Sequence, residues 1–442
     1  MAQAFSLNEA YISHAKRRLV SPAMVQSIMQ TTTGLVSCRS FSVLVLLAAL
    51  ANSAIAVVSR SHTVTRVTEE GREAREASAF LPFESFVEVN GRAYIHGSAE
   101  YEQRESIYKR RAAEASEHNS NPGRRWTAGV NHLWDWTDNE LSTLHGWSRS
   151  ARPEASGFVG HGGPRLAGRP RSQGGEFLAQ QLSPLPAEKS WTHLTSAKNV
   201  HNQGGCGSCW AIASATMLEA HTEIHSARRT FSAQQLVSCV PNPQECGGEG
   251  GCRGATAELA MDWVMNHGCP EEFEVPYSGS QSACDTTHQE TTKLANASSA
   301  GAGSWGMKRW ERLPENQYEP LMRAVVELGP VAVSVAATTW HTYSHGIFDS
   351  CSADAIIDHA VLLDGYGEDQ SSGAKYWLIQ NSWGQDWGEK GFIRVLRRDT
   401  DQDECGIDNQ PQLGSGCKGG PPQVRVCGMC GILYDTVVVH FS

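Results

Sequence analysis

The chain has 442 residues, of which 40% are apolar, 19% charged and 8% aromatic, and its net charge is −10. This composition is typical of a globular protein of two or three domains and argues against wholesale disorder or a multispan membrane protein. Nucleic acid is not expected as a partner, because there is no basic surplus to neutralise phosphates. The 13 cysteines indicate an oxidising compartment, since reduced cytosolic enzymes rarely carry so many.

Charge and cysteine are distributed unevenly along the chain. Residues 1–58 have a net charge of +3 and residues 59–184 a net charge of 0, whereas residues 185–442 hold 17 basic and 30 acidic residues, a net charge of −13. Twelve of the 13 cysteines also follow residue 200. We therefore expect the C-terminal part of the chain to form a disulfide-rich body.

The N-terminal region has the pattern of a secretory signal. An apolar run at 41–50 (FSVLVLLAAL) precedes the small residues AIA at 54–56, which are typical of a cleavage site. We expect residues 1–56 to form the signal region, and translation from Met24 or Met29 would give a signal of more ordinary length. An uncleaved anchor is the alternative, and only that alternative would attach the protein to a membrane.

A detachable segment is predicted between the signal and the body, over residues 57–148. Residues 100–119 carry apolar positions among charges at the spacing of a surface helix. Opposite charges four residues apart, such as Glu100 and Arg104, fit ion pairs on its solvent face. Residues 149–184 are rich in Gly, Pro and Arg, the composition of an exposed linker that a protease can cut.

The most informative stretch is NQGGCGSCW at 202–210. Apolar residues at helical spacing from Trp210 onward predict a helix that begins near Cys209. The positive end of the helix dipole favours a thiolate on that cysteine. Cys206 and Cys209 stand three residues apart, so a redox pair or half of a metal site is an alternative interpretation.

A nucleophilic cysteine requires a base, and the base requires an orienting partner. His359 begins one strand-like run and Asn381 follows another. Adjacent strands would bring the two together, so that Asn381 accepts a hydrogen bond from the imidazole while an indole such as Trp383 excludes water. The amide of Gln203 is a candidate donor to an oxyanion, beside the backbone N–H of Cys209.

These residues, together with C-G-S-C-W at 206–210, resemble the papain family of cysteine peptidases, and within it the cathepsin L branch. The resemblance implies an α+β fold with two lobes, a mainly helical one over about 185–300 and a β-barrel-like one thereafter. The active cleft would lie between them. The implied catalytic residues are Cys209, His359, Asn381 and Gln203.

The resemblance also implies where a peptide substrate binds. The implied lining residues are Gly254, Ala255, Thr256, Ala257, Ser334, Ile357, Ala360 and Trp383. Ala255 departs from the family pattern, which has glycine at this position. The resemblance implies that the pocket for the second residue before the cleaved bond is a medium apolar slot without an acidic floor, which favours Leu, Val or Phe over Arg. Its implied walls are Thr256, Ala257, Ser334, Ile357 and Ala360.

Residues of the prosegment resemble the inhibitory segment of the same family. The matching positions are Glu100, Arg104, Ile107, Tyr108, Asn119, Gly129, Asn131 and Asp135, whereas Arg111, Ala115 and Leu133 depart from the pattern. A zymogen is implied, in which the prosegment inhibits the peptidase domain at 185–442. We expect basic residues of the prosegment to form ion pairs with the acidic body, and acid to weaken those pairs.

The resemblance implies part of the disulfide pattern. Cys206 would pair with Cys252, Cys239 with Cys284, and Cys351 with Cys405 or Cys430. Cys269 is the expected free thiol, while Cys246, Cys417 and Cys427 stay unassigned, and the insertion between residues 405 and 430 has no predicted role. Asn296, in the sequence N-A-S, is the expected glycosylation site.

The predicted function is that of a lysosomal-type or secreted cysteine endopeptidase, monomeric, acting on peptides and proteins through a thioester and requiring no metal or organic cofactor. We expect it to enter the secretory pathway and to work in a lysosome-like or vacuole-like acidic compartment or outside the cell. A catalytically inactive papain-like binding protein and an acyl transferase are the alternatives. The intact reactive residues disfavour the inactive binding protein. An acyl transferase would more usually have Asp as its third reactive residue, so Asn381 disfavours that alternative.

Overall fold

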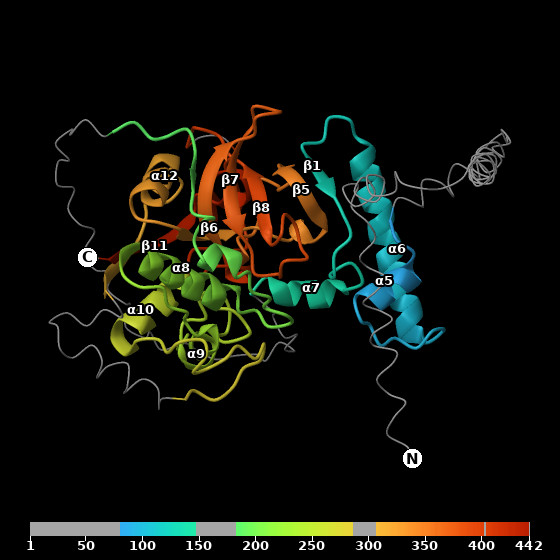
Figure 1. The fold of residues 1–442 in the computed structure, drawn as a ribbon, viewed down its shortest axis with the longest axis horizontal. Coiled ribbons are helices and arrows are strands. Elements are labelled where there is room, and N and C mark those ends of the chain that lie inside the picture. The colour runs from blue at the N-terminus through green and yellow to red at the C-terminus, as the bar shows by residue number, and fades with distance from the viewer. Residues whose placement is uncertain (1–79, 147–182, 286–305, 402–403, 442) are drawn as a thin grey trace, which may run out of the picture. The chain divides into compact units, whose positions relative to one another are not determined.

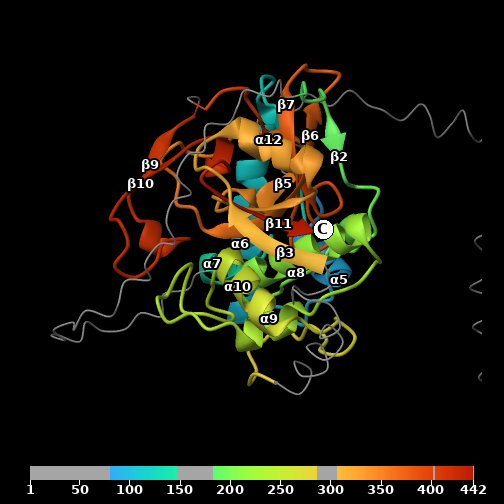
Figure 2. The same cartoon turned by 90° about the vertical axis from the view of Figure 1, so that its left-hand side faces the viewer.

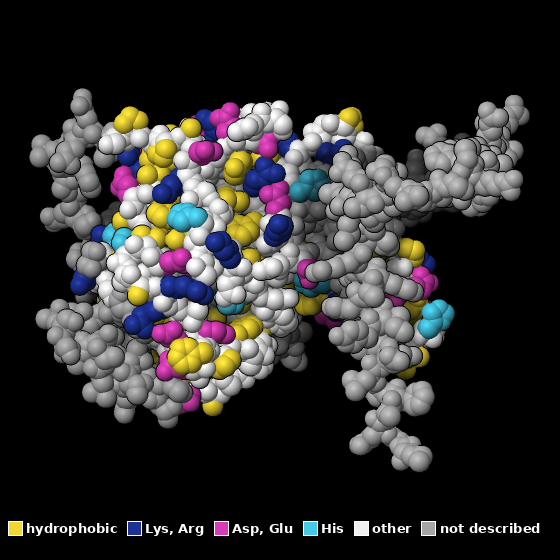
Figure 3. Space-filling model, viewed as in Figure 1, with side chains coloured by type: hydrophobic (Ala, Val, Ile, Leu, Met, Phe, Trp, Pro, Cys, Tyr) yellow, Lys and Arg dark blue, Asp and Glu magenta, His cyan; other side chains and the backbone are white. Residues whose placement is uncertain are grey.

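The computed structural model describes residues 80–146, 183–285, 306–401 and 404–441. The predicted signal region, nearly all of the predicted linker and Asn296 lie outside these residues. No helix within them is long and apolar enough to span a membrane. On the face drawn in Figure 3, acidic and basic side chains are intermixed and form no continuous basic surface among the residues described.

The first lobe of the body contains, among its described residues, the three helices α8 (Cys209–His225), α9 (Ala233–Cys239) and α10 (Ala257–His267), drawn green to yellow in Figure 1. The central helix, α8, is buried along most of its length because it contacts α9, α10, the short turn η1 (Ser196–Lys198) and strands of the second lobe. The small side chains of its alanines allow neighbouring elements to pack closely against the helix on several sides. Helix α8 therefore lies at the junction of the two lobes.

The second lobe is built on a sheet whose nine described strands follow the order β1, β5, β8, β7, β6, β4, β11, β3, with β2 paired to β6. Only the β5–β8 pair among them is parallel. The strands are β1 (Trp126–Ala128), β2 (Lys189–Ser190), β3 (Met307–Arg312), β4 (Val331–Val335), β5 (Tyr343–Phe348), β6 (His359–Glu368), β7 (Lys375–Gln380), β8 (Phe392–Leu396) and β11 (Asp435–Phe441).

The α+β architecture with a helical lobe and a sheet lobe is confirmed. Strand β6 is buried over most of its length because α8 and α12 (Tyr318–Glu327) both contact it. One boundary differs from the prediction: β2 precedes the helices in the chain but pairs with β6, so the first residues of the body belong to the sheet. Short turns η3 (Trp340–Thr342) and η5 (Met429–Gly431) lie in the connections.

The prosegment folds as a helical unit of α5 (Phe83–Val89), α6 (Ala99–Ser120) and α7 (Asp138–Leu144). Its core is aromatic. The ring centroids of Phe86 and Tyr108 lie 4.8 Å apart, and that of Tyr108 lies 5.7 Å from that of Trp134. Helix α6 therefore buries one face in this cluster, which a reading of its charges alone does not reveal.

Arg111, which departs from the family pattern, is buried inside this unit. Its side chain is 1% exposed, and its Nη1 donates a hydrogen bond to the carbonyl of Leu133 at 2.8 Å. Burial lowers the pKa of this guanidinium to about 10, and the carboxylate of Asp138 at 3.6 Å supplies compensating charge. Arg111 thus ties α6 to the turn that precedes α7.

Strand β1 docks the prosegment on the body by extending the sheet of the second lobe. It pairs antiparallel with β5, with Trp126 opposite Gly346. The ring of Trp126 lies 4.9 Å from that of Phe348 and is nearly buried. Gly346 has a φ of +102°, and a Cβ there would crowd the backbone of β1, so this close approach requires glycine.

The expectation that ion pairs hold the prosegment on the acidic body is largely wrong. The basic residues of α6 pair within the prosegment instead, Arg104 with Glu140, Lys109 with Glu105, and Arg110 with Glu114 and Asp138. The reason is local geometry, since carboxylates four residues away or on α7 lie nearer than those of the body. Arg125 and Asp349, at 2.9 Å, are an exception that crosses to the body.

Five disulfides join the described cysteines. They are Cys206–Cys252, Cys239–Cys284, Cys246–Cys417, Cys351–Cys430 and Cys405–Cys427. The pairing of Cys351 with Cys405 is therefore wrong, because Cys405 closes a hairpin onto Cys427 and leaves Cys430 for Cys351. Among the described cysteines, Cys209 and Cys269 are free and buried.

The hairpin closed by Cys405 and Cys427 is the insertion that precedes the last strand. It consists of β9 (Gly406–Asp408), the turn η4 (Pro411–Leu413) and β10 (Val424–Val426). Strands β9 and β10 form a two-stranded sheet of their own, and Figure 2 shows them side by side, outside the main sheet. The insertion is therefore an ordered element with its own backbone pairing.

Candidate active site

Cys209 is the first residue of α8 and is 2% exposed. The turn before it is fixed by the Cys206–Cys252 disulfide and by a hydrogen bond from the N–H of Gly207 to the carbonyl of Cys252 at 2.9 Å. Since Cys206 is bonded to Cys252, it forms no redox pair with Cys209. No group of three metal-ligating side chains gathers within the described ranges.

His359 and Asn381 lie side by side, as the two strand-like runs of the sequence predicted. Strands β6 and β7 are antiparallel neighbours, so the start of β6 lies beside the end of β7. The imidazole Nε2 and Asn381 Oδ1 are 2.8 Å apart, and both side chains are buried. The indole of Trp383 covers the pair, with its ring centroid 5.1 Å from that of His359.

Gln203 is fully buried and its amide is held at both ends. Its Oε1 accepts a hydrogen bond from Ser382 Oγ at 2.6 Å, and its Nε2 donates to the carbonyl of Leu144 at 3.0 Å. Leu144 is the last residue of α7, so this donor already binds a peptide carbonyl, one that belongs to the prosegment. The side-chain amide thus marks a carbonyl-binding position in the cleft.

The end of the described prosegment lies against the reactive residues. Gly146 has a φ of +66°, and a Cβ added to it would stand 2.9 Å from the Sγ of Cys209. His145 places its Nδ1 3.7 Å from a carboxylate oxygen of Asp358. The backbone of Gly146 also approaches Gly254 so closely that a Cβ on Gly254 would overlap the Gly146 carbonyl oxygen. In this form the prosegment fills the cleft.

Burial under the prosegment disfavours the charged forms of Cys209 and His359. It raises the pKa of the Cys209 thiol to about 12 and lowers that of the His359 imidazole to about 4. Desolvation disfavours both ions, and this outweighs the hydrogen bond that the imidazole donates to Asn381 Oδ1, which favours the imidazolium. In the precursor, burial therefore works against the thiolate–imidazolium pair expected from the sequence.

A cavity of about 20 Å³ remains beside Cys209 and His359 while the prosegment is in place. Five of the eight predicted substrate-site residues line it, namely Ala255, Thr256, Ser334, Ile357 and Ala360. Gly254 meets the prosegment backbone instead, Ala257 begins α10, and Trp383 lies over His359 and Asn381.

The cavity has walls that the sequence did not identify. Gly247 lies on one side of it, and Gly414 and Ser415 of the insertion also line it. The carboxylate of Asp435 lies behind Ser334, which lines the cavity. It accepts a hydrogen bond from Ser334 Oγ at 2.7 Å and forms an ion pair with Arg312 at 3.0 Å. Asp435 does not itself line the cavity and its charge is engaged, whereas Asp358 does line it, so the absence of an acidic floor in the specificity pocket remains a prediction.

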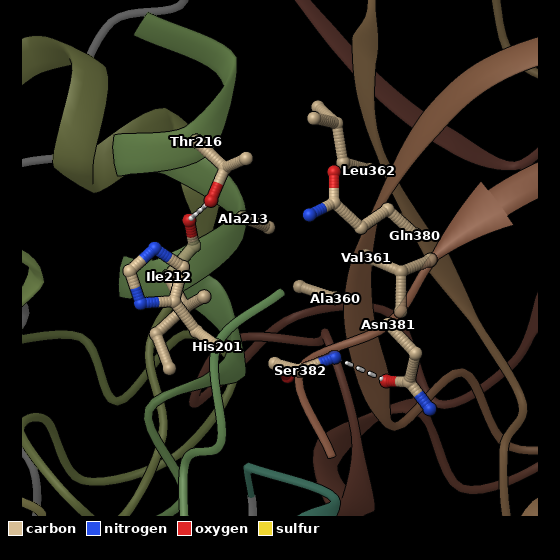
Figure 4. A pocket seen from close by; sticks show the side chains of 10 residues that line it. All are labelled: His201, Ile212, Ala213, Thr216, Ala360, Val361, Leu362, Gln380, Asn381 and Ser382. Carbon is tan, nitrogen blue, oxygen red and sulfur yellow. Dashed lines mark hydrogen bonds between the residues drawn. The ribbon is translucent and has the colours of Figure 1, made fainter. Parts of the chain in front are cut away.

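A second small cavity lies between the lobes, behind the reactive residues. Figure 4 shows side chains of α8, such as Thr216, facing those of β6 and the end of β7. In the same view Asn381 Oδ1 accepts a hydrogen bond from the backbone N–H of Ser382, at 2.8 Å. Its volume of about 10 Å³ is near the minimum for one water molecule. The cavity therefore lies at the interface between the two lobes.

The family model of the papain family cysteine proteases matches residues 185–415, just over half of the chain. The chain belongs to the papain family of cysteine proteases. A model of the cathepsin propeptide inhibitor domain matches residues 83–141, which contain α5 and α6 and most of α7. The protein is therefore a cysteine endopeptidase, a hydrolase made as a zymogen with its own inhibitory prosegment.

Individual relatives agree with this assignment. The chain is 31% identical over 317 residues to the cysteine endopeptidase RepA of Oryza sativa subsp. japonica, which covers 70% of this chain and 76% of the relative. It is 34% identical over 246 residues to cathepsin K of Gallus gallus, covering 54% and 67%. Its fold matches a digestive procathepsin L2 proteinase of Tenebrio molitor larval midgut with a TM-score of 0.58 and 25% identity, over 81% of this chain and 98% of that chain.

Proposed function

We propose that Cys209 is the nucleophile, His359 the general acid and base, and Asn381 the residue that orients the imidazole. Gln203 Nε2 and the backbone N–H of Cys209 are the proposed oxyanion donors. The observation that carries this assignment is the carbonyl of Leu144, which accepts the Gln203 amide at 3.0 Å in the same cleft as Cys209 and His359. A peptide carbonyl fits the place where a substrate carbonyl must react.

The proposed reaction has two stages. The thiolate of Cys209 attacks the substrate carbonyl, and the carbon–nitrogen bond breaks as His359 gives its proton to the leaving amine. Water then gives a proton to His359 and attacks the thioester, which releases the carboxylic acid and restores the thiol–imidazole pair. Helix α8 supports the thiolate through its N-terminal dipole. These steps become possible once the prosegment has left the cleft and solvent can stabilise the ions.

Labelling with a thiol-directed peptide epoxide tests the assignment of the nucleophile. The matured protein should carry one label on Cys209, located by peptide mapping, and Cys209→Ala should carry none and hydrolyse nothing. Label on Cys269 instead of Cys209 would overturn the assignment. The result also distinguishes an enzyme from a binding-only homologue, because only an activated thiol opens the epoxide.

Hydrolysis is favoured over acyl transfer because Asn381, a neutral amide, orients the imidazole. Mass analysis of the products from one peptide, with and without an added primary amine, tests this. A free carboxylic acid should be the main product in both samples. An amide formed with the added amine as the main product would favour the acyl transferase.

The remaining assignments follow from the sequence and the family. We propose that the signal directs the chain into the secretory pathway, to an acidic lysosome-like compartment or to the exterior, that Asn296 is glycosylated, and that the mature enzyme is a monomer. Cleavage within residues 149–184 would leave a body that begins near Leu185. The proposed walls of the pocket for the second residue before the cut are Thr256, Ser334, Ile357 and Ala360, with Ala255 in place of the Ala257 expected from the sequence, because Ala255 and not Ala257 lines the cavity. Mass analysis of the secreted protein, before and after removal of N-glycans, checks the processing site and the glycan.

A further inference from the structure

Residues 409–418 form a strap that crosses the cleft from one lobe to the other. They are carried by the hairpin of β9 and β10, whose base is closed by the Cys405–Cys427 disulfide. The strap begins after Asp408, passes through the turn η4 and ends at Cys417 and Lys418. It is part of the insertion, which has no role in the proposed catalytic steps.

On the side of the second lobe the strap is bound to the segment that leads into β6. The backbone N–H of Ser415 donates to the carbonyl of Ile357 at 2.7 Å, and a Cβ on Gly414 would overlap the same carbonyl. The N–H of Ile357 points to the carboxylate of Asp408 at 3.3 Å. This attachment lies two residues before His359.

On the side of the first lobe the strap is bound to the loop that follows α9. The N–H of Gly247 donates to the carbonyl of Gly416 at 3.1 Å, and that of Lys418 donates to the carbonyl of Gln244 at 2.8 Å. The Cys246–Cys417 disulfide makes this attachment covalent. Gly247 in turn lies against Ala255, since a Cβ on it would stand 2.6 Å from the Ala255 carbonyl.

Successive residues of the strap face two separate spaces. Gly414 and Ser415 line the cavity that contains Cys209 and His359. Gln412 and Leu413, immediately before them, line a different hollow of about 420 Å³, together with Glu245, Gly248, Glu249, Lys418 and Gly419. The strap is therefore the partition between the reactive cavity and this outer hollow, and both ends of the partition are anchored.

We propose that the strap is a specificity element that forms the end wall of the pocket for the second residue before the cleaved bond. Because it joins both sides of the cleft at the level of Ala255 and Ile357, a longer substrate has no straight path beyond that pocket and must leave the cleft there. Recognition on this side is confined to two residues. This inference rests on the proposed function, since it takes Cys209 as the point of cleavage.

Two fluorogenic peptides test the proposal, and both have the same two residues before the cleaved bond. The short peptide carries a blocking group on the second of these residues, whereas the extended peptide continues by two further residues. With the matured enzyme, the extension should change kcat/KM by less than about two-fold. In the double variant Cys246→Ser with Cys417→Ser, which releases one end of the strap, the extended peptide should gain about ten-fold over the short one. Lys418→Ala, which removes an exposed ion pair with Glu245 but keeps the disulfide, is the matched control and should behave as the unaltered enzyme.

A second variant keeps the test decisive where the double variant does not fold, as judged by circular dichroism. Ser415→Phe adds bulk to the wall and should lower kcat/KM about ten-fold for a peptide with Phe at the second position relative to one with Ala. Gln412→Phe, on the outer side of the same strap, should leave that ratio unchanged. An extended peptide preferred by the unaltered enzyme, or an unchanged ratio in Ser415→Phe, overturns the strap proposal alone. Failure to cleave even the short peptide overturns the proposed function and this inference with it.

Discussion

The backbone carbonyl of Leu144 accepts a hydrogen bond from Nε2 of Gln203 at 3.0 Å. Leu144 belongs to the prosegment and Gln203 to the body. Gly146, two residues after Leu144, lies against the sulfur of Cys209. The precursor therefore blocks its reactive cleft with its own peptide groups. The hydrogen bond between His359 and Asn381 is already present in this precursor, whereas burial disfavours the charged forms of Cys209 and His359.

Replacement of Gln203 by alanine should remove the side-chain donor that now holds the Leu144 carbonyl. We expect kcat to fall by about 10²–10³-fold with little change in KM, because this donor acts on charge that develops in the transition state. Steady-state kinetics on a short fluorogenic peptide measure both constants. Ser382→Ala, which removes only the hydroxyl that holds the Gln203 amide, is the matched control and should cost less. An unchanged kcat in Gln203→Ala would show that the donor lies elsewhere.

Alkylation of Cys209 should differ between the precursor and the mature enzyme. Burial keeps the pKa of this thiol at about 12 and that of His359 at about 4 in the precursor, so iodoacetamide should react very slowly near neutral pH. Removal of the prosegment restores hydration, and α8 with His359 should then bring the thiol pKa to roughly 3–4. Rates followed by peptide mapping should be high from weak acid upward, and peptidase activity should be bell-shaped across the same range. A mature enzyme alkylated only above about pH 8 would contradict the ion pair.

His145 should couple prosegment docking to pH. Burial lowers its pKa from 6.5 to about 4, so it stays neutral when docked but takes up a proton below about pH 6.5 when released. Docking is therefore strongest above pH 6.5 and weakens by about 1.4 kcal/mol per pH unit as the pH falls towards 4. The precursor should convert to the mature size when held near pH 4.5, and Cys209→Ala should not if the cut is its own.

Substitution of His145 by glutamine removes this titration and should move the midpoint of conversion to lower pH. His96→Gln, at an exposed position of the prosegment, should leave the midpoint in place. Gel analysis of each precursor after incubation across pH 4 to 7 gives the midpoints. Equal midpoints for the His145 variant and the unaltered precursor would assign acid activation to other groups.

Truncation of Trp126 to alanine should release the prosegment at neutral pH. The side chain is 7% exposed and packs on Phe348 in the sheet of the body, and loss of a buried Trp costs about 3–5 kcal/mol. The variant precursor should hydrolyse a peptide at pH 7 before any cleavage, which an activity assay beside a gel will reveal. Arg124→Ala, an exposed neighbour, is the control. A fully silent Trp126→Ala precursor would show that β1 contributes little to inhibition.

At the second position before the cut, Leu, Val or Phe should be preferred over Arg. Asp435 lies behind Ser334, but its carboxylate is paired with Arg312 and bonded to the Ser334 hydroxyl, so little of its charge is available. Arg312→Met should free that carboxylate and raise the acceptance of Arg about ten-fold relative to Leu. A peptide library measures both enzymes. Arg as the best residue for the unaltered enzyme would refute this account of the pocket.

The sequence by itself predicted which residues form the candidate site, because each of them stands in a short sequence pattern. Helical spacing after Cys209 predicted the N-terminus of α8, and two strand-like runs placed His359 beside Asn381, which β6 and β7 confirm. Short-range rules suffice where a reactive residue stands at the end of a regular element.

Only the tertiary structure decided what lies across the cleft. The pairing of Cys246 with Cys417 spans 171 residues, and no local pattern specifies which cysteines approach at such separation. The sequence suggested that the basic residues of α6 pair with the acidic body. In the fold, Arg104 and Arg110 pair with acidic residues of α7 instead. The protonation states of Cys209 and His359 likewise depend on the prosegment that covers them, because desolvation is set by the whole packed assembly and not by neighbours in sequence.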